Sequence, residues 1–116
     1  MNSLIEQIFN DFEVGGVKIP VSFLRYSGKS TTYITYQLMS SGDSFSGDDE
    51  LINYVDHYDF DIYSKGNYFQ IIDSVKKILK DNGFVWQPSM SSGDIFEDDT
   101  GYYHKTLNFA YLREEK

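Results

Sequence analysis

The last quarter of the chain, from Asp94 to Leu112, constrains the fold more than any other segment. The run Asp98-Asp99-Thr100-Gly101 consists of residue types that favour turns. After this run, Tyr103, Leu107, Phe109 and Tyr111 alternate with His104, Thr106 and Asn108. Alternation with a period of two places the apolar set on one face of a β-strand and the polar set on the other. The segment therefore predicts a turn followed by a long, half-buried strand.

Two other segments have the periodicity of amphipathic helices. Ser3-Leu-Ile-Glu6 is a capping box, an apolar stripe follows it, and the helix should end at Gly15-Gly16. From Tyr68 to Leu79, apolar residues recur at i, i+3, i+4, i+7, i+10 and i+11, as in a helix that packs on a core. Asn67 is a candidate cap for this second helix, and Asn82-Gly83 is a strong stop signal.

Strand character recurs in residues 17–25, 31–39, 51–63 and 84–87. Pro20 predicts an edge strand, and Ser27-Gly-Lys-Ser30 predicts a hairpin turn between the first two strands. Residues 40–50 are rich in Ser, Gly and Asp and predict an exposed loop. Residues 1–116 are expected to form a single α+β domain in the order α-β-β-β-α-β-β. Its mostly antiparallel sheet should have about four to five strands, with two helices packed on one face.

Acidic residues are common in the predicted strands. Asp56 interrupts the apolar face of residues 51–63, which indicates a bulge or an exposed end. Asp59 and Asp61 fall on the other face, which we expect to be exposed to solvent. These carboxylates could gather a divalent cation with the pair at 98–99 if the strands were adjacent, but the EF-hand pattern is absent. Solvated carboxylates at strand edges are the favoured interpretation.

No motif indicates catalysis or a cofactor. His57 and His104 fall on the polar sides of predicted strands without metal-ligand spacing, so a surface or hydrogen-bonded role is favoured. Ser27-Gly-Lys-Ser-Thr31 resembles the end of a phosphate-binding loop, but Phe23 stands where that loop has its first Gly, and a strand follows in place of a helix. The absence of cysteine excludes disulfides and thiol chemistry. We expect no catalytic residue, no cofactor, no metal site and no enzyme.

The chain is acidic and aromatic. Ten Lys and Arg against eighteen Asp and Glu give a net charge of −8, and aromatic residues make up 17%. DNA and anionic membranes are poor partners for such a chain, because phosphate groups are held by concentrated Lys and Arg. Tyr-rich strands suit a sheet with one exposed face, and they suit protein–protein contact equally well. Neither a signal peptide nor a membrane-spanning apolar run is recognisable, so we expect the chain to fold in the cytosol.

Five blocks of the sequence, taken in order, resemble the phage tail terminator family. These are the tail-to-head joining, or tail completion, proteins of long-tailed phages and prophages. The blocks are Thr32 to Tyr36, Ser46 to Glu50, Asp61 to Tyr68, Asn82 to Phe84 and Glu97 to Lys105. They extend over almost the whole chain. The commonest form of the family has Trp where this chain has Tyr63, and Arg where it has Asn108.

The resemblance implies a structural protein that takes part in virion assembly. Its subunits would form a hexameric ring that caps the finished tail tube and docks it to the head connector, with DNA passing through the ring. The implied partners are further copies of the chain, the tail-tube protein and the head–tail connector protein, with no membrane and no sequence-specific nucleic acid. The implied location is the host cytoplasm during assembly and then the head-proximal end of the virion tail.

A subunit in a cyclic ring needs two different complementary faces, and we expect Tyr-rich strand edges and the loop 40–50 to supply them. The candidate interaction residues are Phe45, Asp48, Asp49, Glu50, Asp98, Asp99, Tyr103 and His104. Carboxylates that line a channel repel DNA phosphates within a Debye length, about 8 Å at physiological salt. Asp48 to Glu50 are the first candidates for such a lining and Asp98-Asp99 the second. The competing interpretation is that these groups only keep the surface soluble.

Two further interpretations of the whole chain remain. One is a monomeric domain whose strand edges are protected by Asp and Pro. The other is a small acidic regulatory or inhibitory protein, such as a DNA mimic that binds a host nucleic-acid enzyme. It is based on the net charge of −8 and on the acidic clusters at 48–50 and 98–99. DNA mimicry would require these carboxylates to lie at phosphate-like spacing along one surface.

Overall fold

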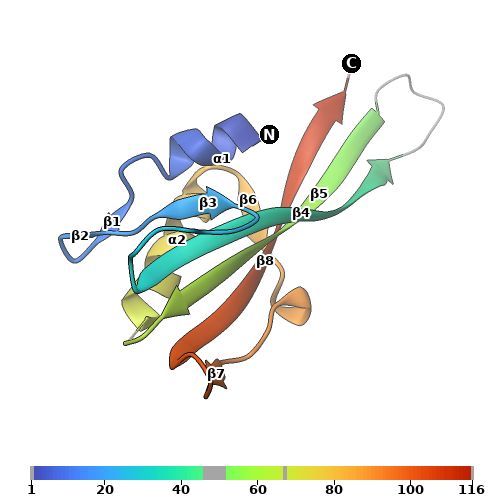
Figure 1. The fold of residues 1–116 in the computed structure, drawn as a ribbon. Helices are drawn as coiled ribbons and strands as arrows, with labels where there is room; N and C mark the ends of the chain where they lie inside the picture. The colour runs from blue at the N-terminus through green and yellow to red at the C-terminus, as the bar shows by residue number, and fades with distance from the viewer. Residues whose placement is uncertain (1, 46–51, 67, 116) are drawn as a thin grey trace.

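The computed structural model describes residues 2–45, 52–66 and 68–115. Its elements, in chain order, are α1 (Asn2–Ile8), β1 (Glu13–Val14), β2 (Val17–Lys18), β3 (Val21–Phe23), β4 (Thr32–Phe45), β5 (Ile52–Ser64), α2 (Phe69–Asp81), β6 (Phe84–Trp86), the short 3-10 helix η1 (Pro88–Met90), β7 (Ile95–Glu97) and β8 (Tyr102–Glu115) (Figure 1). Strands dominate, and α1 and α2 accompany them, so the predicted α+β class is confirmed.

Three long strands, β4, β5 and β8, form the centre of the sheet and pair in antiparallel fashion. The strand order is β3-β4-β5-β8-β6, and β7 pairs with the beginning of β8. β3 runs parallel to β4, with Val21 opposite Ile34, so the sheet is mixed. Because a parallel pair cannot be closed by a hairpin, the predicted hairpin turn at Ser27 to Ser30 is wrong. The single strand predicted over residues 17–25 is also divided, into β2 and β3, at Ile19-Pro20.

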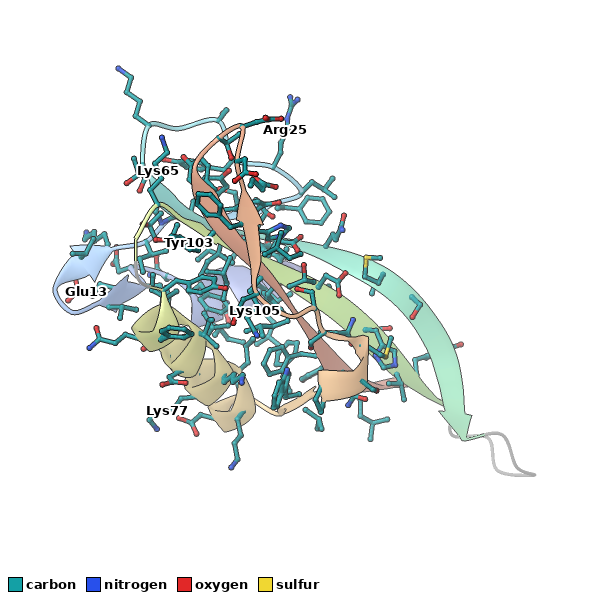
Figure 2. The ribbon with its side chains drawn as sticks, turned by 90° about the horizontal axis from the view of Figure 1, so that it is seen from below. Glu13, Arg25, Lys65, Lys77, Tyr103 and Lys105 are labelled. Carbon is teal, nitrogen blue, oxygen red and sulfur yellow. The ribbon has the colours of Figure 1, made fainter. Side chains whose placement is uncertain are left out.

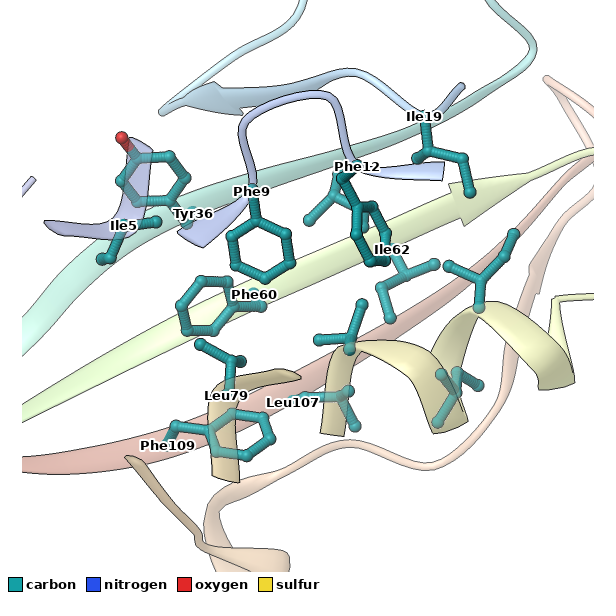
Figure 3. Close-up of a cluster of buried hydrophobic side chains, with 14 of the residues drawn as sticks. Ile5, Phe9, Phe12, Ile19, Tyr36, Phe60, Ile62, Leu79, Leu107 and Phe109 are labelled. Carbon is teal, nitrogen blue, oxygen red and sulfur yellow. The ribbon is translucent and has the colours of Figure 1, made fainter. Parts of the chain in front are cut away.

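One face of the sheet carries the hydrophobic core. Side chains from α1, from the turn after it and from α2 pack against this face (Figure 3). Phe60 of β5 lies at the centre and is fully buried, with the ring centroids of Phe9, Tyr36 and Phe109 at 5.9, 6.0 and 5.8 Å. The alternation predicted for the last strand is confirmed, because Leu107 and Phe109 both lie in this core.

The N-terminal helix is shorter than predicted. α1 begins at Asn2 and ends at Ile8, so Ser3 lies inside the helix and is not its N-cap. Gly15 and Gly16 have φ angles of 61° and 83° and form the turn between β1 and β2. They do not end the helix, because the chain has already left it several residues earlier. The apolar stripe predicted for this segment nevertheless contributes to the core.

The second helix, α2, agrees closely with its prediction. Ile71, Ile72, Val75 and Leu79 are its buried residues. The N-cap is Tyr68, whose side chain makes no capping bond, and the predicted cap Asn67 lies outside the described residues. The helix ends at Asp81, as the Asn82-Gly83 stop signal predicts, and Gly83 adopts a φ of 90°. This left-handed conformation is accessible to glycine at little cost.

β4 is longer than predicted. It continues through Phe45, so residues 40–45 pair with β5 and do not form a loop. Residues 46–51 lie outside the described part of the chain. A β-bulge at Met39, between the Leu38–Tyr58 and Ser40–His57 pairs, changes the faces on which the side chains of β4 lie. The Ser- and Gly-rich sequence after the bulge has no apolar alternation, so nothing in its pattern predicted a strand.

Candidate interaction surfaces

A three-stranded arm, residues 38–45, 52–57 and 112–115, continues β4, β5 and β8 beyond the body of the molecule (Figure 1). β3 makes its last pair with β4 at Tyr36, and β6 pairs with β8 only as far as Tyr111. Beyond these points no other described strand flanks the arm, and Figure 2 shows that α2 does not reach it. Within the described residues, the arm therefore has two open edges, one from β4 and one from β8.

Large apolar side chains are exposed at both open edges. Leu38 and Met39 are 48% and 51% exposed on the β4 edge, and Leu112 is 59% exposed on the β8 edge. Residues 37–42 contain neither a charge nor a proline. Monomeric proteins protect open edges with charges, prolines or bulges, and of these devices this run has only the bulge at Met39. The β4 edge is therefore available for pairing with another strand.

A buried carboxylate joins two strands where the arm begins. Asp56 shares the face that carries the core and is only 2% exposed. Ser41 Oγ donates a hydrogen bond to Asp56 Oδ1 at 2.7 Å and so connects β4 to β5. A bulge is present nearby in β4, as Asp56 led us to expect, but the alternative of an exposed strand end is wrong. Asp56 marks the position where the apolar core ends.

The other face of the sheet carries polar side chains that bond to each other across β5 and β8. Asn108 is 1% exposed and donates from Nδ2 to Asp59 Oδ1 at 2.8 Å. Its amide oxygen therefore accepts from His57 Nδ1, which lies 3.1 Å away. Burial raises the pKa of Asp59; the bond from Asn108 lowers it and the nearby Asp61 raises it. The expectation that this face is simply exposed to solvent is wrong, because Asn108 is buried and its neighbours are half-buried.

A second polar group lies further along the same two strands. Thr106 Oγ1 donates to Asp61 Oδ1 at 2.5 Å, and His104 Nε2 lies 3.3 Å from the same oxygen. Glu97 of β7 places a carboxylate oxygen 3.9 Å from His104 Nδ1. His104 therefore has a hydrogen-bonded role, in line with the sequence interpretation, and links the β7–β8 hairpin to β5. Within the described ranges, no three His, Asp or Glu side chains converge as metal ligands would.

Four aromatic rings form a stack on this face. Tyr26 stacks on Tyr33 at 4.6 Å, Tyr33 on Tyr63 at 4.8 Å, and Tyr63 on His104 at 4.3 Å. The stack connects the segment after β3 with β4, β5 and β8. Burial raises the pKa of Tyr63 from the ordinary value of 10.0 to about 12. The stack therefore joins four segments of the chain on the face of the sheet opposite the core.

A cleft of about 450 Å³ lies at the end of the sheet away from the arm, where Figure 2 shows Lys65 and Tyr103. Tyr68 donates its hydroxyl to Asp94 Oδ1 at 2.6 Å in the wall of the cleft. This hydrogen bond lowers the pKa of Asp94, while burial first and the bond second raise the pKa of Tyr68. Beside it, Phe69 is 60% exposed and Tyr103 is 41% exposed. The cleft combines apolar walls with mixed charges and contains no arrangement of groups typical of catalysis.

The predicted interaction residues of the central loop are only partly described. Phe45 is the last residue of β4 and pairs with Asn53 at the far end of the arm. Asp48, Asp49 and Glu50 lie outside the described residues. Phe45 is therefore the described member of this group, and its backbone lies on the arm.

The other four predicted residues lie at the opposite end of the sheet. Asp98 and Asp99 are exposed in the turn between β7 and β8. The side chains of Tyr103 and His104, the next two predicted residues on β8, lie on opposite faces of the sheet. Tyr103 lines the cleft, and His104 belongs to the polar network. Among the described residues, Phe45 therefore lies at one end of the long strands and these four residues lie at the other, so they do not make one site.

The arm edges and the buried Asn108 were not among the predicted interaction residues. Only one signal for the polar network was present in the sequence, namely that polar residues alternate in both 57–61 and 104–108. Pairing of these two segments brings the polar side chains together, but the register of that pairing is a long-range property.

Among the described residues, no helix is long and apolar enough to cross a membrane. Comparison with models of known protein families gives no match, and comparison with curated proteins finds no similar sequence.

Proposed function

We propose that the protein is a structural subunit of a long-tailed phage virion, one that forms a hexameric ring, ends tail-tube polymerisation and joins the tail to the head connector. The observation that carries the proposal is the arm with its two open edges. Each subunit of a cyclic ring offers two different faces to its neighbours, and the β4 and β8 edges are two such faces on one subunit. The phage-tail context and the number six come from the resemblance of the five sequence blocks.

The long sheet also suits a subunit that lies between two different partners. Its arm end has open strand edges and exposed Leu38, Met39 and Leu112. Its other end has the acidic turn 98–101 and the apolar cleft beside Tyr103. A tail tube and a head connector would each need a surface of their own, and these ends differ in chemistry. The polar side chains between them are hydrogen-bonded to each other, which favours a structural role over a catalytic one.

The proposal is tested by mixing the full chain with the tail-tube protein of the same phage or prophage while the tube polymerises. Electron microscopy should reveal a ring at one end of each tube and a shorter, narrower distribution of tube lengths than without the chain. Light scattering on the same mixtures would give the mass of the assembled ring. Tubes that grow unaffected, with the chain strictly monomeric beside both tube and connector at micromolar concentration, would contradict the proposal.

The inhibitor interpretation receives less support from the arrangement of carboxylates. A DNA mimic needs free carboxylates along one surface, whereas Asp59 and Asp61 are half-buried and hydrogen-bonded to Asn108 and Thr106. The exposed Asp98 and Asp99 form only a short cluster. Recovery of a basic nucleic-acid-binding protein from host lysate, lost at high salt because salt screens exposed charges, would favour this interpretation over the ring.

A further inference from the structure

We infer that the β8 edge of one copy's arm pairs in parallel with the β4 edge of the next copy, so that the arms of a ring form one continuous sheet. The inference rests on the proposed function, because it specifies how subunits of the ring join. It goes further by naming the strands, their relative direction and the face on which their side chains meet.

The direction of pairing follows from the topology of the arm. β4 and β8 are both antiparallel to β5 and lie on opposite sides of it, so they run in the same direction. Rotation about a ring axis that lies along the strands preserves this direction from copy to copy. The β8 edge of one copy would therefore meet the β4 edge of the next as a parallel pair.

Pairing between identical edges would give a different assembly. A two-fold contact of β4 with β4, or of β8 with β8, is isologous and closes after two copies. It would leave the other edge of each arm open, with its exposed leucine still in water. Head-to-tail pairing instead satisfies both edges of every arm in a closed ring, because each β4 edge meets a β8 edge.

The contact would join a charge-free run of the β4 edge to a β8 edge on which the apolar Leu112 precedes the charged Arg113, Glu114 and Glu115. The β4 edge carries Leu38 and Met39, and the β8 edge carries Leu112, all about half exposed or more. Residues 37–42 bring no charge that would have to be buried. An extended strand that adds to such an edge gains main-chain hydrogen bonds, and its side chains determine the register.

The pleat restricts the possible registers. Leu112, Val55 and Gly42 are opposite one another in the sheet and share one face, and Ser40 lies on this face as the partner of His57. Leu38 is the partner of Tyr58 and lies on the other face. Because neighbouring strands place side chains at the same level on the same face, Leu112 should meet Gly42 or Ser40 of the next copy, and not Leu38.

The inference is tested by cysteine cross-linking, for which the cysteine-free chain is a clean background. The two test variants are Gly42→Cys/Leu112→Cys and Ser40→Cys/Leu112→Cys. A Cβ added at Gly42 meets no atom within 4 Å, and Ser40 and Leu112 are exposed, so the fold should tolerate both. Strands in a sheet are about 4.8 Å apart, within the Cα separation that a disulfide can span.

Mild oxidation of the assembled material should give a ladder of covalent oligomers up to the full ring in one of these double variants. Each single-cysteine variant should give no covalent oligomer, because head-to-tail pairing never places a residue against its own copy. The matched control Leu38→Cys/Leu112→Cys has the same strands and edges but the wrong face, and it should lose the ladder. Covalent dimers from a single variant, or a ladder from this control, would overturn the inference.

Hydrogen exchange of the unmodified chain provides a second measurement that needs no variant to fold. Amides at the open edges, in residues 38–42 and at Leu112, should exchange more slowly in the assembled state than in the free subunit. Rings visible at tube ends without edge protection, and without cross-links in either test variant, would overturn the inference and leave the proposed function standing. If no ring forms with the tube protein, the proposed function fails and the inference fails with it.

Discussion

The same three strands, β4, β5 and β8, run through two regions that differ in how they are covered. In the body, one face of the sheet is packed against α1 and α2 and the other carries the aromatic stack and polar network. In the arm, strand pairing continues, but no described strand flanks its edges and α2 does not reach it (Figure 2). Strand pairing alone therefore does not determine what a region contributes. The body contains the hydrophobic core, whereas in the proposed ring the arm would present its backbone and side chains to a neighbouring copy.

The sequence changes where one region becomes the other. Positions on the core face of β5 are occupied by Ile62, Phe60 and Tyr58 in the body and then by Asp56 at the start of the arm. An apolar residue at that position would have extended the core and required further cover. Asp56 is buried and accepts a hydrogen bond from Ser41, so a polar contact takes the place of an apolar one where the arm begins.

The largest expected effect is the loss of a core side chain in the body. Phe60→Ala should lower the free energy of unfolding by about 3–5 kcal/mol, because a fully buried aromatic ring is replaced by a cavity. Leu112→Ala in the arm should change it by no more than about 0.5 kcal/mol, because this side chain is exposed. Chemical denaturation of both variants measures the contrast. Similar losses for the two would mean that the arm belongs to the folding core.

The next effect concerns the second face of the body. Asn108→Ala should lower the free energy of unfolding by about 1–3 kcal/mol, because Asp59 and His57 each lose a buried partner. In a double-mutant cycle, the same substitution should cost less once Asp59 is also replaced by Ala. Strict additivity of the two substitutions would show that the Asn108–Asp59 hydrogen bond contributes nothing to stability.

Asp59 should also give the body a recognisable pH dependence. Burial raises the pKa of Asp59 in the folded state above its value in the unfolded chain, so protonation of Asp59 favours the folded state. This stabilisation is complete at pH values below the pKa of the unfolded state. It is lost as pH rises through the pKa of the folded state. Asp59→Asn removes this dependence, and the stability of the variant relative to the unmodified chain should increase with pH over the acidic range. Thermal unfolding at a series of pH values measures this trend.

Tyr68→Phe provides a control of opposite sign. The hydrogen bond from the Tyr68 hydroxyl lowers the pKa of Asp94 in the folded state, so ionisation of Asp94 favours the folded state. This stabilisation is present at pH values above the pKa of the unfolded state and is lost as pH falls through the pKa of the folded state. The Tyr68→Phe variant should therefore become less stable relative to the unmodified chain as pH rises over the same range. Identical trends for the two variants would contradict the assigned causes of the pKa shifts.

The smallest expected effect on stability comes from charge reversal outside the described residues. Replacement of Asp48, Asp49 and Glu50 by Lys should change the free energy of unfolding by no more than about 0.5 kcal/mol, because the sequence predicts an exposed loop at these residues. If these residues line the channel of the proposed ring, the same change should impair DNA passage in assembled particles. Asp98→Lys/Asp99→Lys tests the alternative lining. Normal DNA ejection with both sets reversed would assign these charges to solubility alone.

The sequence predicted the elements whose signals are local. α2 has both a helical apolar stripe and a glycine stop at Gly83, and β8 has alternation between Tyr103 and Tyr111. The parallel β3–β4 pair was not predictable in this way, because the turn-forming residues 27–30 are equally compatible with a hairpin and with a crossover. The arm was missed because Ser40 to Phe45 has no apolar periodicity, and its strand conformation depends on pairing with β5.

The candidate surfaces were predictable to a smaller extent. Alternation placed His104 and Asn108 on the polar face correctly, but it could not indicate that Asn108 would be buried between Asp59 and His57. Burial there depends on register across β5 and β8 and on the loop after β6, where Ser91 Oγ accepts from the Asn108 amide. The open edges of the arm are likewise a property of strand order, which no single segment encodes.

In the proposed ring, the arm edges join copies of the chain while the body folds independently of assembly. The most direct test is the mass of assemblies formed with tail-tube protein by Leu112→Lys, by Val17→Lys and by the unmodified chain. Val17 is 61% exposed in β2, away from the arm, and matches the 59% exposure of Leu112. We predict rings for the unmodified chain and for Val17→Lys, and monomers with an unchanged unfolding temperature for Leu112→Lys. Rings of equal mass from all three would show that the arm edges do not join the copies.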